Sequence, residues 1–153
     1  EANDLMKRSF GRNRHQSEKS EAANKYQNQK TNGVGGRKYD SKLEADYASQ
    51  LEARRLAKEI SDWKPQVCLH LYVNGEKICS YFMDFVVTHN DGVLELVEVK
   101  GFPTPEWKKK WNLTKALLPM GEINGVPKDS RLTLVKKGTK NGFYSEPQLL
   151  NYR

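Results

Sequence analysis

Three consecutive stretches of the sequence alternate apolar and polar side chains and are separated by turn signals. Residues 67–73 have the two-residue period of a strand with one buried face, and Asn-Gly at 74–75 is a strong hairpin signal. Residues 78–87 read as the returning strand, and the turn at 89–92 leads into a third strand over residues 93–100. The pattern predicts an antiparallel three-stranded meander.

Two segments with helical periodicity flank this meander. Residues 41–60 carry an apolar stripe at helical spacing, and Pro65 ends the helical pattern. The second helix begins after Thr104, a suitable N-cap, with a proline and a glutamate in its first turn. We expect Trp107 and Trp111 to point from this helix into the core, with the intervening lysines on its open side.

A further strand over residues 131–137 is expected in the same sheet, and a short helical turn in the tail over residues 142–153. This order of elements predicts an α/β fold, in which a mixed, mainly antiparallel central sheet is flanked by helices in the order α-β-β-β-α-β. We assign this domain to residues 39–153. Residues 1–38 are polar, and we expect a basic, flexible arm there with a short helix over residues 19–26.

The chain is basic, with a net charge of +7 over 153 residues. A positive protein of this size favours a polyanionic partner, most often nucleic acid. The alternative, a basic surface that serves only solubility, stays open at this point. The candidate nucleic-acid contacts lie at the end of the arm and on the second helix: Arg37, Lys38, Lys108, Lys109, Lys110 and Lys115.

Composition also bears on the compartment. No run of residues approaches the roughly 18 apolar residues of a membrane span, so we expect no membrane segment. Cys68 and Cys79 lie in apolar alternating segments and are expected to be buried thiols, which favours a cytoplasmic protein, in the host cell if the chain is phage-encoded. The three histidines are scattered and predict no zinc site.

Three charged residues interrupt the apolar strands. Glu98 and Lys100 are two apart, so they share one face of the third strand. Asp84 lies among apolar residues of the second strand, where a carboxylate costs several kcal/mol to bury unless it is paired or binds a metal. Counting about the turn places Asp84 opposite Leu96 or Val97, so a register shift or a bulge is needed to bring it beside Glu98.

Two neighbouring carboxylates repel each other, and a hard divalent cation removes the conflict. Mg²⁺, for which Mn²⁺ can substitute, is commonly held by one or two carboxylates together with water and substrate phosphate. With Lys100 to orient the attacking water, Asp84 and Glu98 suit metal-assisted phosphodiester hydrolysis. The alternative is a purely structural role, in which Glu98 and Lys100 form an ion pair on an exposed strand and Asp84 accepts hydrogen bonds from backbone amides.

Glu44 has two competing interpretations. Ser41 and Glu44 fit a capping box, which would explain the glutamate structurally. Glu44 also borders the apolar stripe of its helix, which would direct it over the sheet. The sequence leaves both open.

Taken together, "SKLE" (41–44), "MDF" (83–85) and "VEVKG" (97–101) resemble the motifs of the PD-(D/E)xK nuclease superfamily. From about Asn24 to Leu118 the chain is similar to small phage-type endonucleases, which resemble phage endonuclease I and the archaeal-type Holliday-junction resolvases. The resemblance implies a restriction-endonuclease-like core and a Mg²⁺-dependent endonuclease that cuts branched DNA. It also implies a homodimer, since two strands must be cut.

The resemblance further implies a role for each matching residue. Glu44 corresponds to the carboxylate of the first helix, and Asp84 and Glu98 correspond to the metal ligands. Lys100 corresponds to the catalytic lysine, and Gln66 to a glutamine found near the site. The metal hypothesis adds the carbonyl of Val99 as a third ligand, with Glu44 contributing directly or through water. The chain departs from the motif at Met83, where the superfamily often has proline.

Three rival functions remain. The first is a non-catalytic DNA- or RNA-binding module, and the second is a phage assembly or virion protein. Both leave Asp84, within its apolar strand, unexplained. The third is a sequence-specific restriction endonuclease, for which the chain leaves little room for a recognition domain.

Overall fold

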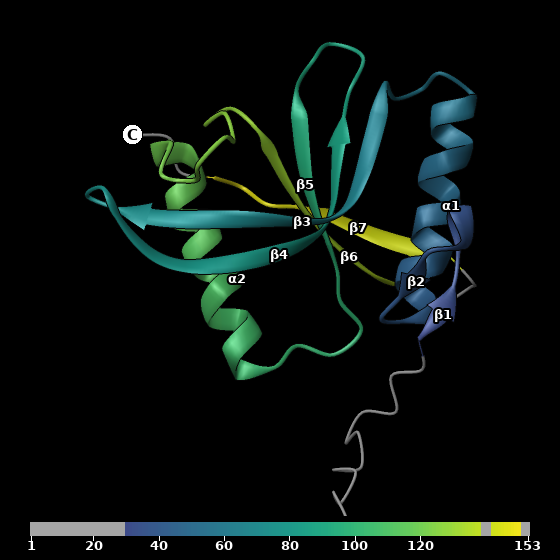
Figure 1. Ribbon diagram of the computed structural model, residues 1–153, viewed down its shortest axis with the longest axis horizontal. Helices are drawn as coiled ribbons and strands as arrows, with labels where there is room; N and C mark the ends of the chain where they lie inside the picture. Colours follow the sequence, from purple (N-terminus) through teal and green to yellow (C-terminus); the bar gives the residue numbers. More distant parts are fainter. Residues whose placement is uncertain (1–29, 139–141, 151–153) are drawn as a thin grey trace, which may run out of the picture.

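The computed structural model describes residues 30–138 and 142–150 (Figure 1). A two-stranded hairpin precedes the first helix, and a five-stranded sheet with a second helix follows. In chain order the elements are β1 Thr31–Asn32, η1 Val34–Gly36, β2 Lys38–Tyr39, α1 Lys42–Leu56, β3 Asp62–Val73, β4 Glu76–Thr88, β5 Leu94–Val99, α2 Pro105–Leu117, η2 Leu118–Met120, β6 Arg131–Lys137 and β7 Phe143–Pro147.

The main sheet has the strand order β3-β4-β5-β6-β7. Neighbouring strands are antiparallel except β5 and β6, which are parallel and are joined through α2. A parallel pair needs such a crossover, because its connection must return to the same end of the sheet. The predicted α/β class, with a mixed and mainly antiparallel sheet flanked by helices, is confirmed.

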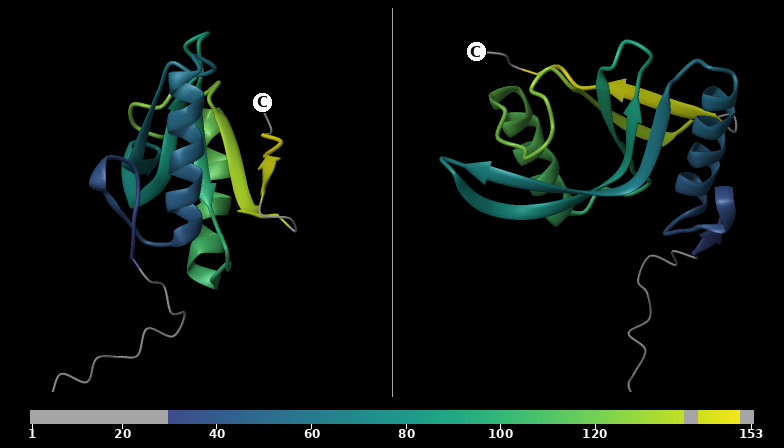
Figure 2. Two further views of the ribbon diagram at one scale, coloured as in Figure 1. Left: turned by 90° about the vertical axis from the view of Figure 1, so that its right-hand side faces the viewer. Right: turned by 45° about the horizontal axis from the view of Figure 1, so that its top comes forward.

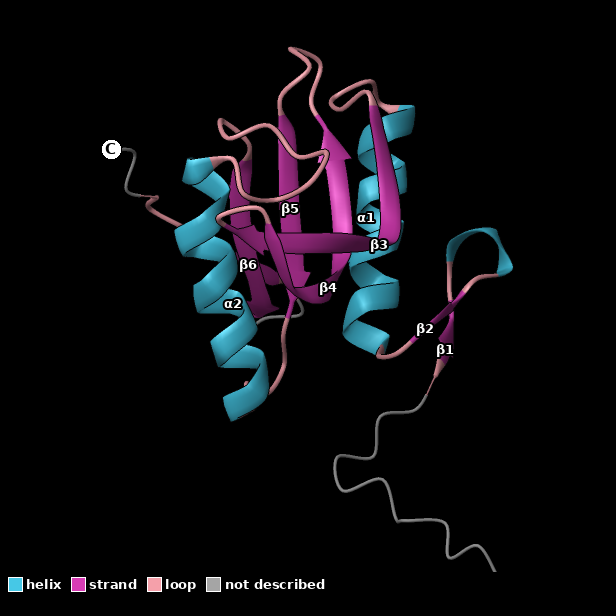
Figure 3. Ribbon diagram, turned by 60° about the vertical axis from the view of Figure 1, so that its left-hand side comes forward, coloured by secondary structure: helices cyan, strands magenta, loops and turns pink. Residues whose placement is uncertain are grey.

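The two helices cover opposite faces of the sheet (Figure 3). Successive residues of β5 show this, because Leu96 packs in the cluster that includes α2, while Val97 packs in the cluster that includes α1. Leu51 of α1 and Trp111 of α2 anchor the two clusters, with exposures of 0% and 4%. The predicted core position of Trp111 is confirmed.

β3 and β4 form a long, curved hairpin that reaches from α1 to α2 (Figures 1 and 2). The hairpin changes the face that it buries along its length. Phe85 and Val87 pack in the α1 cluster, whereas Tyr81 and Met83 of the same strand pack in the α2 cluster. Asp84 lies at this transition.

The caps that start the helices are those expected from the sequence. The Ser41 hydroxyl accepts a hydrogen bond from the Glu44 amide at the start of α1. The Thr104 hydroxyl accepts from the Trp107 amide at the start of α2. Each cap satisfies one amide that has no partner inside its helix.

Three expectations about the elements are wrong. The first helix ends at Leu56 rather than at residue 60, and β3 starts at Asp62, so it contains Pro65. This proline is tolerated because β3 is an edge strand, where a missing amide breaks no ladder. The tail does not form a helical turn over the described residues, because Phe143–Pro147 pair with β6 as a strand.

The end of the predicted arm is folded. Thr31–Asn32 and Lys38–Tyr39 pair as a small hairpin, whose Tyr39 is 1% exposed. Gly33 is required at its position, because a Cβ there would lie 2.5 Å from the Tyr39 ring. The helix expected over residues 19–26 lies outside the described residues.

Two further observations concern the expected compartment. Cys68 is exposed and Cys79 is half-buried, and both are free. The expectation of two buried thiols is therefore wrong for Cys68, which lies on the outer face of the edge strand β3. No helix in the described part of the chain is long and apolar enough to cross a membrane.

Candidate functional site

The pairing of β4 with β5 brings Asp84 into line with Glu98. Phe85 pairs with Val97, and the same register continued by one residue sets the two acids side by side. The Val99 amide donates a hydrogen bond to Asp84 Oδ2 at 2.8 Å, which links the two strands at this point. No bulge between these strands is needed, so the expected alignment of Asp84 with Leu96 or Val97 is wrong.

The length of the turn explains this register. Thr88 pairs with Leu94, which leaves a five-residue connection. The His89 amide donates to the Val93 carbonyl, and the Gly92 amide donates to the His89 carbonyl, both at 2.9 Å. With a five-residue connection, each residue of β4 pairs with a residue further along β5 than a count about residues 89–92 predicts.

Glu98 is buried, at 4% exposure, and its two carboxylate oxygens differ in their hydrogen bonds. The Trp107 indole donates to Oε1 at 2.8 Å. Oε2 has no hydrogen-bond partner among the described residues. An unsatisfied buried carboxylate oxygen is costly in a folded protein, so this atom is the first place to look for a bound cation.

Burial raises the pKa of each acid at this site. The pKa of Asp84 lies well above its usual value because of burial and then the charges of Glu98 and Glu44, against a hydrogen bond from Val99. Burial raises the pKa of Glu98 to about 7, against a hydrogen bond from Tyr81 and the charge of Lys100. Without a cation, the site therefore favours the protonated forms of these acids, because burial and their mutual repulsion disfavour the charged forms.

Glu44 combines the two roles that the sequence left open. Its Oε1 accepts from the Ser41 hydroxyl at 3.0 Å, so its side chain contacts the N-cap residue of α1. It is also buried, at 8% exposure. Burial raises the pKa of Glu44, the hydrogen bond from Ser41 opposes this, and the charge of Lys100 also lowers it. Glu44 thus lies within electrostatic range of the strand residues.

Lys100 follows the end of β5 and is half-buried. Its backbone amide donates to the Val135 carbonyl at 2.8 Å, which fixes the chain at this position. Its ammonium lies 5.6 Å from the centre of the Trp107 ring. Lys100 lowers the pKa values of Asp84, Glu98 and Glu44, so its charge acts on all three acids.

Gln66 adopts an unusual backbone conformation opposite Asp84. Pro65 pairs with Phe85 and Val67 pairs with Met83, which leaves Gln66 and Asp84 facing each other without ladder partners. The φ of Gln66 is +53°, a region that few residues other than glycine adopt. Such strain is often found at functional sites, and it lies where β3 and β4 change the face that they bury.

Two side chains of this site, the carboxylates of Asp84 and Glu98, fit a hard divalent cation. In the described ranges no group of three or more His, Cys, Asp or Glu side chains is close enough to hold a metal together. Glu44 therefore does not join Asp84 and Glu98 in such a group. Two carboxylates, one with a free oxygen, still suffice for Mg²⁺, which keeps several waters and takes substrate phosphate as a ligand.

The predicted basic contacts lie on two separate elements. Arg37 and Lys38 are exposed on the small hairpin beside α1, and Lys108 and Lys109 are exposed on α2. The two other predicted lysines, Lys110 and Lys115, are half-buried on the same helix. Lys110 forms an ion pair with Glu106 at 3.6 Å.

Sequence reasoning missed two residues of the site. No sequence pattern marks Tyr81, and the helical spacing of Trp107 predicts only a core position. The Trp107 indole nitrogen lies 3.0 Å from the Tyr81 hydroxyl and 2.8 Å from Glu98 Oε1. No local sequence signal marks these contacts, because they depend on how α2 packs against the sheet.

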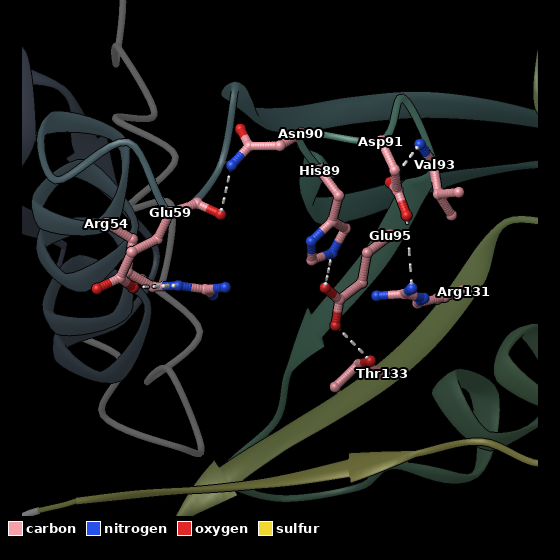
Figure 4. Close-up of polar contacts among 9 residues, drawn as sticks. All are labelled: Arg54, Glu59, His89, Asn90, Asp91, Val93, Glu95, Arg131 and Thr133. Atoms are coloured by element: carbon pink, nitrogen blue, oxygen red, sulfur yellow. Dashed lines mark hydrogen bonds and ion pairs between the residues drawn. The ribbon is translucent and has the colours of Figure 1, made fainter.

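A second acid of β5, which is half-buried, offers a useful contrast (Figure 4). Glu95, on β5, accepts from the Thr133 hydroxyl and contacts His89 Nε2, each at 2.6 Å. Both of its oxygens are satisfied, and the contacts tie the turn after β4 to β6. Glu95 is therefore explained by structure alone, whereas Glu98 is not.

Comparison with known families adds one assignment. Residues 23–127 match the family described as "Protein of unknown function (DUF1064)". The chain belongs to this family. The DUF1064 match contains Glu44, Asp84, Glu98 and Lys100, and it ends before β6. Comparison with curated proteins and with solved structures found no match.

Proposed function

We propose that this DUF1064 protein is a metal-dependent endodeoxyribonuclease that hydrolyses phosphodiester bonds. The observation that carries the proposal is the pairing of half-buried Asp84 with buried Glu98, in which Glu98 Oε2 has no partner among the described residues. The resemblance to the PD-(D/E)xK nucleases gives the same roles to these residues.

Asp84 and Glu98 would hold Mg²⁺ or Mn²⁺, with the Val99 carbonyl as a further ligand and Glu44 acting through water. When bound, the cation supplies a Lewis acid for the phosphoryl oxygen and lowers the pKa of a bound water. The Val99 amide holds Asp84 Oδ2 at 2.8 Å, so this carboxylate keeps one fixed orientation. The unpartnered oxygen of Glu98 is the other preset ligand atom.

Lys100 supplies positive charge where the acids are crowded. Its ammonium would hold the attacking water by a hydrogen bond and reduce the negative charge that develops on the phosphate. Gln66, strained opposite Asp84, would contact the substrate beside the cleaved bond.

The exposed basic residues Arg37, Lys38, Lys108 and Lys109 support DNA as the substrate, since phosphate contacts dominate such binding. Branched DNA, action as a homodimer and a cytoplasmic location are the finer parts of the proposal. They rest on the resemblance to junction-resolving enzymes and on composition.

The test is cleavage of a four-way junction, a linear duplex and a single strand of matched sequence, with Mg²⁺ or with EDTA. We expect Mg²⁺-dependent cutting that is strongest on the junction and is lost in Asp84→Asn and Glu98→Gln, which still bind DNA. Glu95→Gln is the matched control, because it changes a half-buried acid of the same strand whose oxygens are both satisfied.

The outcomes separate the alternatives. Tight binding without cutting of any substrate in Mg²⁺ or Mn²⁺ would favour the non-catalytic binding module or an assembly protein. Cutting that persists in EDTA, or in Glu98→Gln at the wild-type rate, would remove the metal site from the proposal.

A further inference from the structure

Trp107 contacts both charged halves of the candidate site through different parts of one indole ring. The ring nitrogen donates to Glu98 Oε1 at 2.8 Å. The face of the ring lies under the Lys100 ammonium, with 5.6 Å between the nitrogen and the ring centre. This distance is within the range of a cation–π interaction.

The hydrogen bond to Oε1 determines which oxygen of Glu98 remains free. Tyr81 completes the arrangement, because its hydroxyl lies 3.0 Å from the same indole nitrogen and its hydrogen bond lowers the pKa of Glu98. Because Trp107 holds Oε1 from the side of α2, the carboxylate cannot rotate without losing this bond. Oε2 is thereby kept in one direction.

The indole ring itself is held rigidly. It stacks on the Trp111 ring, with 5.6 Å between centroids and an interplanar angle of 19°, and Trp111 is 4% exposed in the core. The Trp107 amide donates to the Thr104 cap at 3.2 Å. A ring fixed by its backbone and by its neighbour can fix the groups that it touches.

We infer that Trp107, assisted by Tyr81, is a positioning residue that presets both the metal-binding carboxylate Glu98 and the catalytic lysine Lys100. The inference rests on the proposed function, since it concerns the same site. Residues that hydrogen-bond to metal ligands typically change metal affinity or activity by 10–100-fold when they are replaced. The two contacts of Trp107 predict two effects that can be measured separately.

The experiment measures Mn²⁺ binding by electron paramagnetic resonance in the absence of DNA, and cleavage at saturating Mn²⁺. Trp107→Phe keeps an aromatic face for Lys100 but removes the donor to Glu98. We expect its Mn²⁺ dissociation constant to rise about tenfold, with the cleavage rate at saturating Mn²⁺ within about twofold of wild type because the ring face remains. Trp107→Leu removes both contacts, so the rate at saturating Mn²⁺ should also fall at least about tenfold.

Trp63→Phe is the matched control. It removes another indole that donates to a carboxylate, from Trp63 to Glu52 at 3.0 Å, on the α1 side of the sheet. Its Mn²⁺ binding should equal that of wild type. Tyr81→Phe is a second test that leaves α2 unchanged, and it should weaken Mn²⁺ binding several-fold because a donor to Glu98 is lost.

The outcomes distinguish this inference from the function on which it rests. If wild type binds Mn²⁺ and Trp107→Phe binds it equally well, the positioning role is wrong and the nuclease proposal stands. If Trp107→Phe does not fold, as judged by circular dichroism, Tyr81→Phe decides, and wild-type affinity in that variant overturns the inference. If wild type binds no Mn²⁺, the metal site itself is wrong and the inference falls with it.

Discussion

Replacing Glu98 by glutamine should stabilise the metal-free protein at alkaline pH. Burial raises the pKa of Glu98 from 4.5 to about 7. The unfolded chain therefore releases this proton at a lower pH than the folded chain does, and the free energy of unfolding falls as the pH rises from 4.5 to 7. Above pH 7 the penalty is constant, at about 3 kcal/mol. Glutamine has no charge to bury, yet its carbonyl oxygen can still accept from Trp107.

The measurement is urea denaturation in EDTA at pH 8 and at pH 4.5. At pH 8 we expect Glu98→Gln to be more stable than wild type by about 2–3 kcal/mol, and at pH 4.5 the difference should nearly disappear because Glu98 is protonated in the folded wild type. Equal stability at pH 8, or a gain that does not change with pH, would refute the reasoning. The opposite effect of Mg²⁺ is a second signature, since the cation should stabilise wild type and not the variant.

Glu52 provides a control of opposite sign. Hydrogen bonds from Arg55 and Trp63 lower the pKa of Glu52 to about 2. Its carboxylate therefore contributes stability above pH 4.5, and this contribution is lost as the pH falls from 4.5 to 2. Glu52→Gln should be less stable than wild type at pH 8. If both variants shift in the same direction, the effect does not come from these charges.

The remaining predictions concern the first helix and the DNA contacts. Glu44→Gln should be at least as stable as wild type, because the amide can still accept from Ser41 and no longer buries a charge. It should nevertheless lose most cleavage of a junction, and normal cleavage would leave Glu44 only its contact with the cap of α1. Replacing Lys108 and Lys109 together by glutamine should reduce the slope of log K against log salt by about two, at about 0.9 for each phosphate contact. An unchanged slope in fluorescence anisotropy titrations would show that the DNA does not contact these two lysines.

The sequence predicted the elements whose signals are local. Alternating residues marked the three strands of the meander, and Ser41 and Thr104 marked the helix starts, because a cap needs only its own first turn. The start of β3 was predicted wrongly because a proline is tolerated in an edge strand, and the sequence does not show that β3 is one. The strand Phe143–Pro147 was missed because it is short and its pairing with β6 is not a local property.

The candidate site likewise contains residues that the sequence predicts and contacts that it does not predict. Asp84, Glu98 and Lys100 stood out because charged residues in apolar strands need a partner. Their register could not be counted correctly, because it depends on a five-residue turn whose hydrogen bonds the sequence does not reveal. The contacts of Trp107 depend on how α2 packs against the sheet, so the sequence could assign this residue only to a helix face.

The most direct test of the central claim is an anomalous difference map from crystals of the protein grown with Mn²⁺. We expect a strong peak in contact with Asp84 and with Glu98 Oε2, the carboxylate oxygen that has no partner among the described residues. The peak should be absent in crystals of Glu98→Gln grown under the same conditions. A map with no peak between β4 and β5, from a protein that cuts DNA in the same Mn²⁺ concentration, would contradict the account.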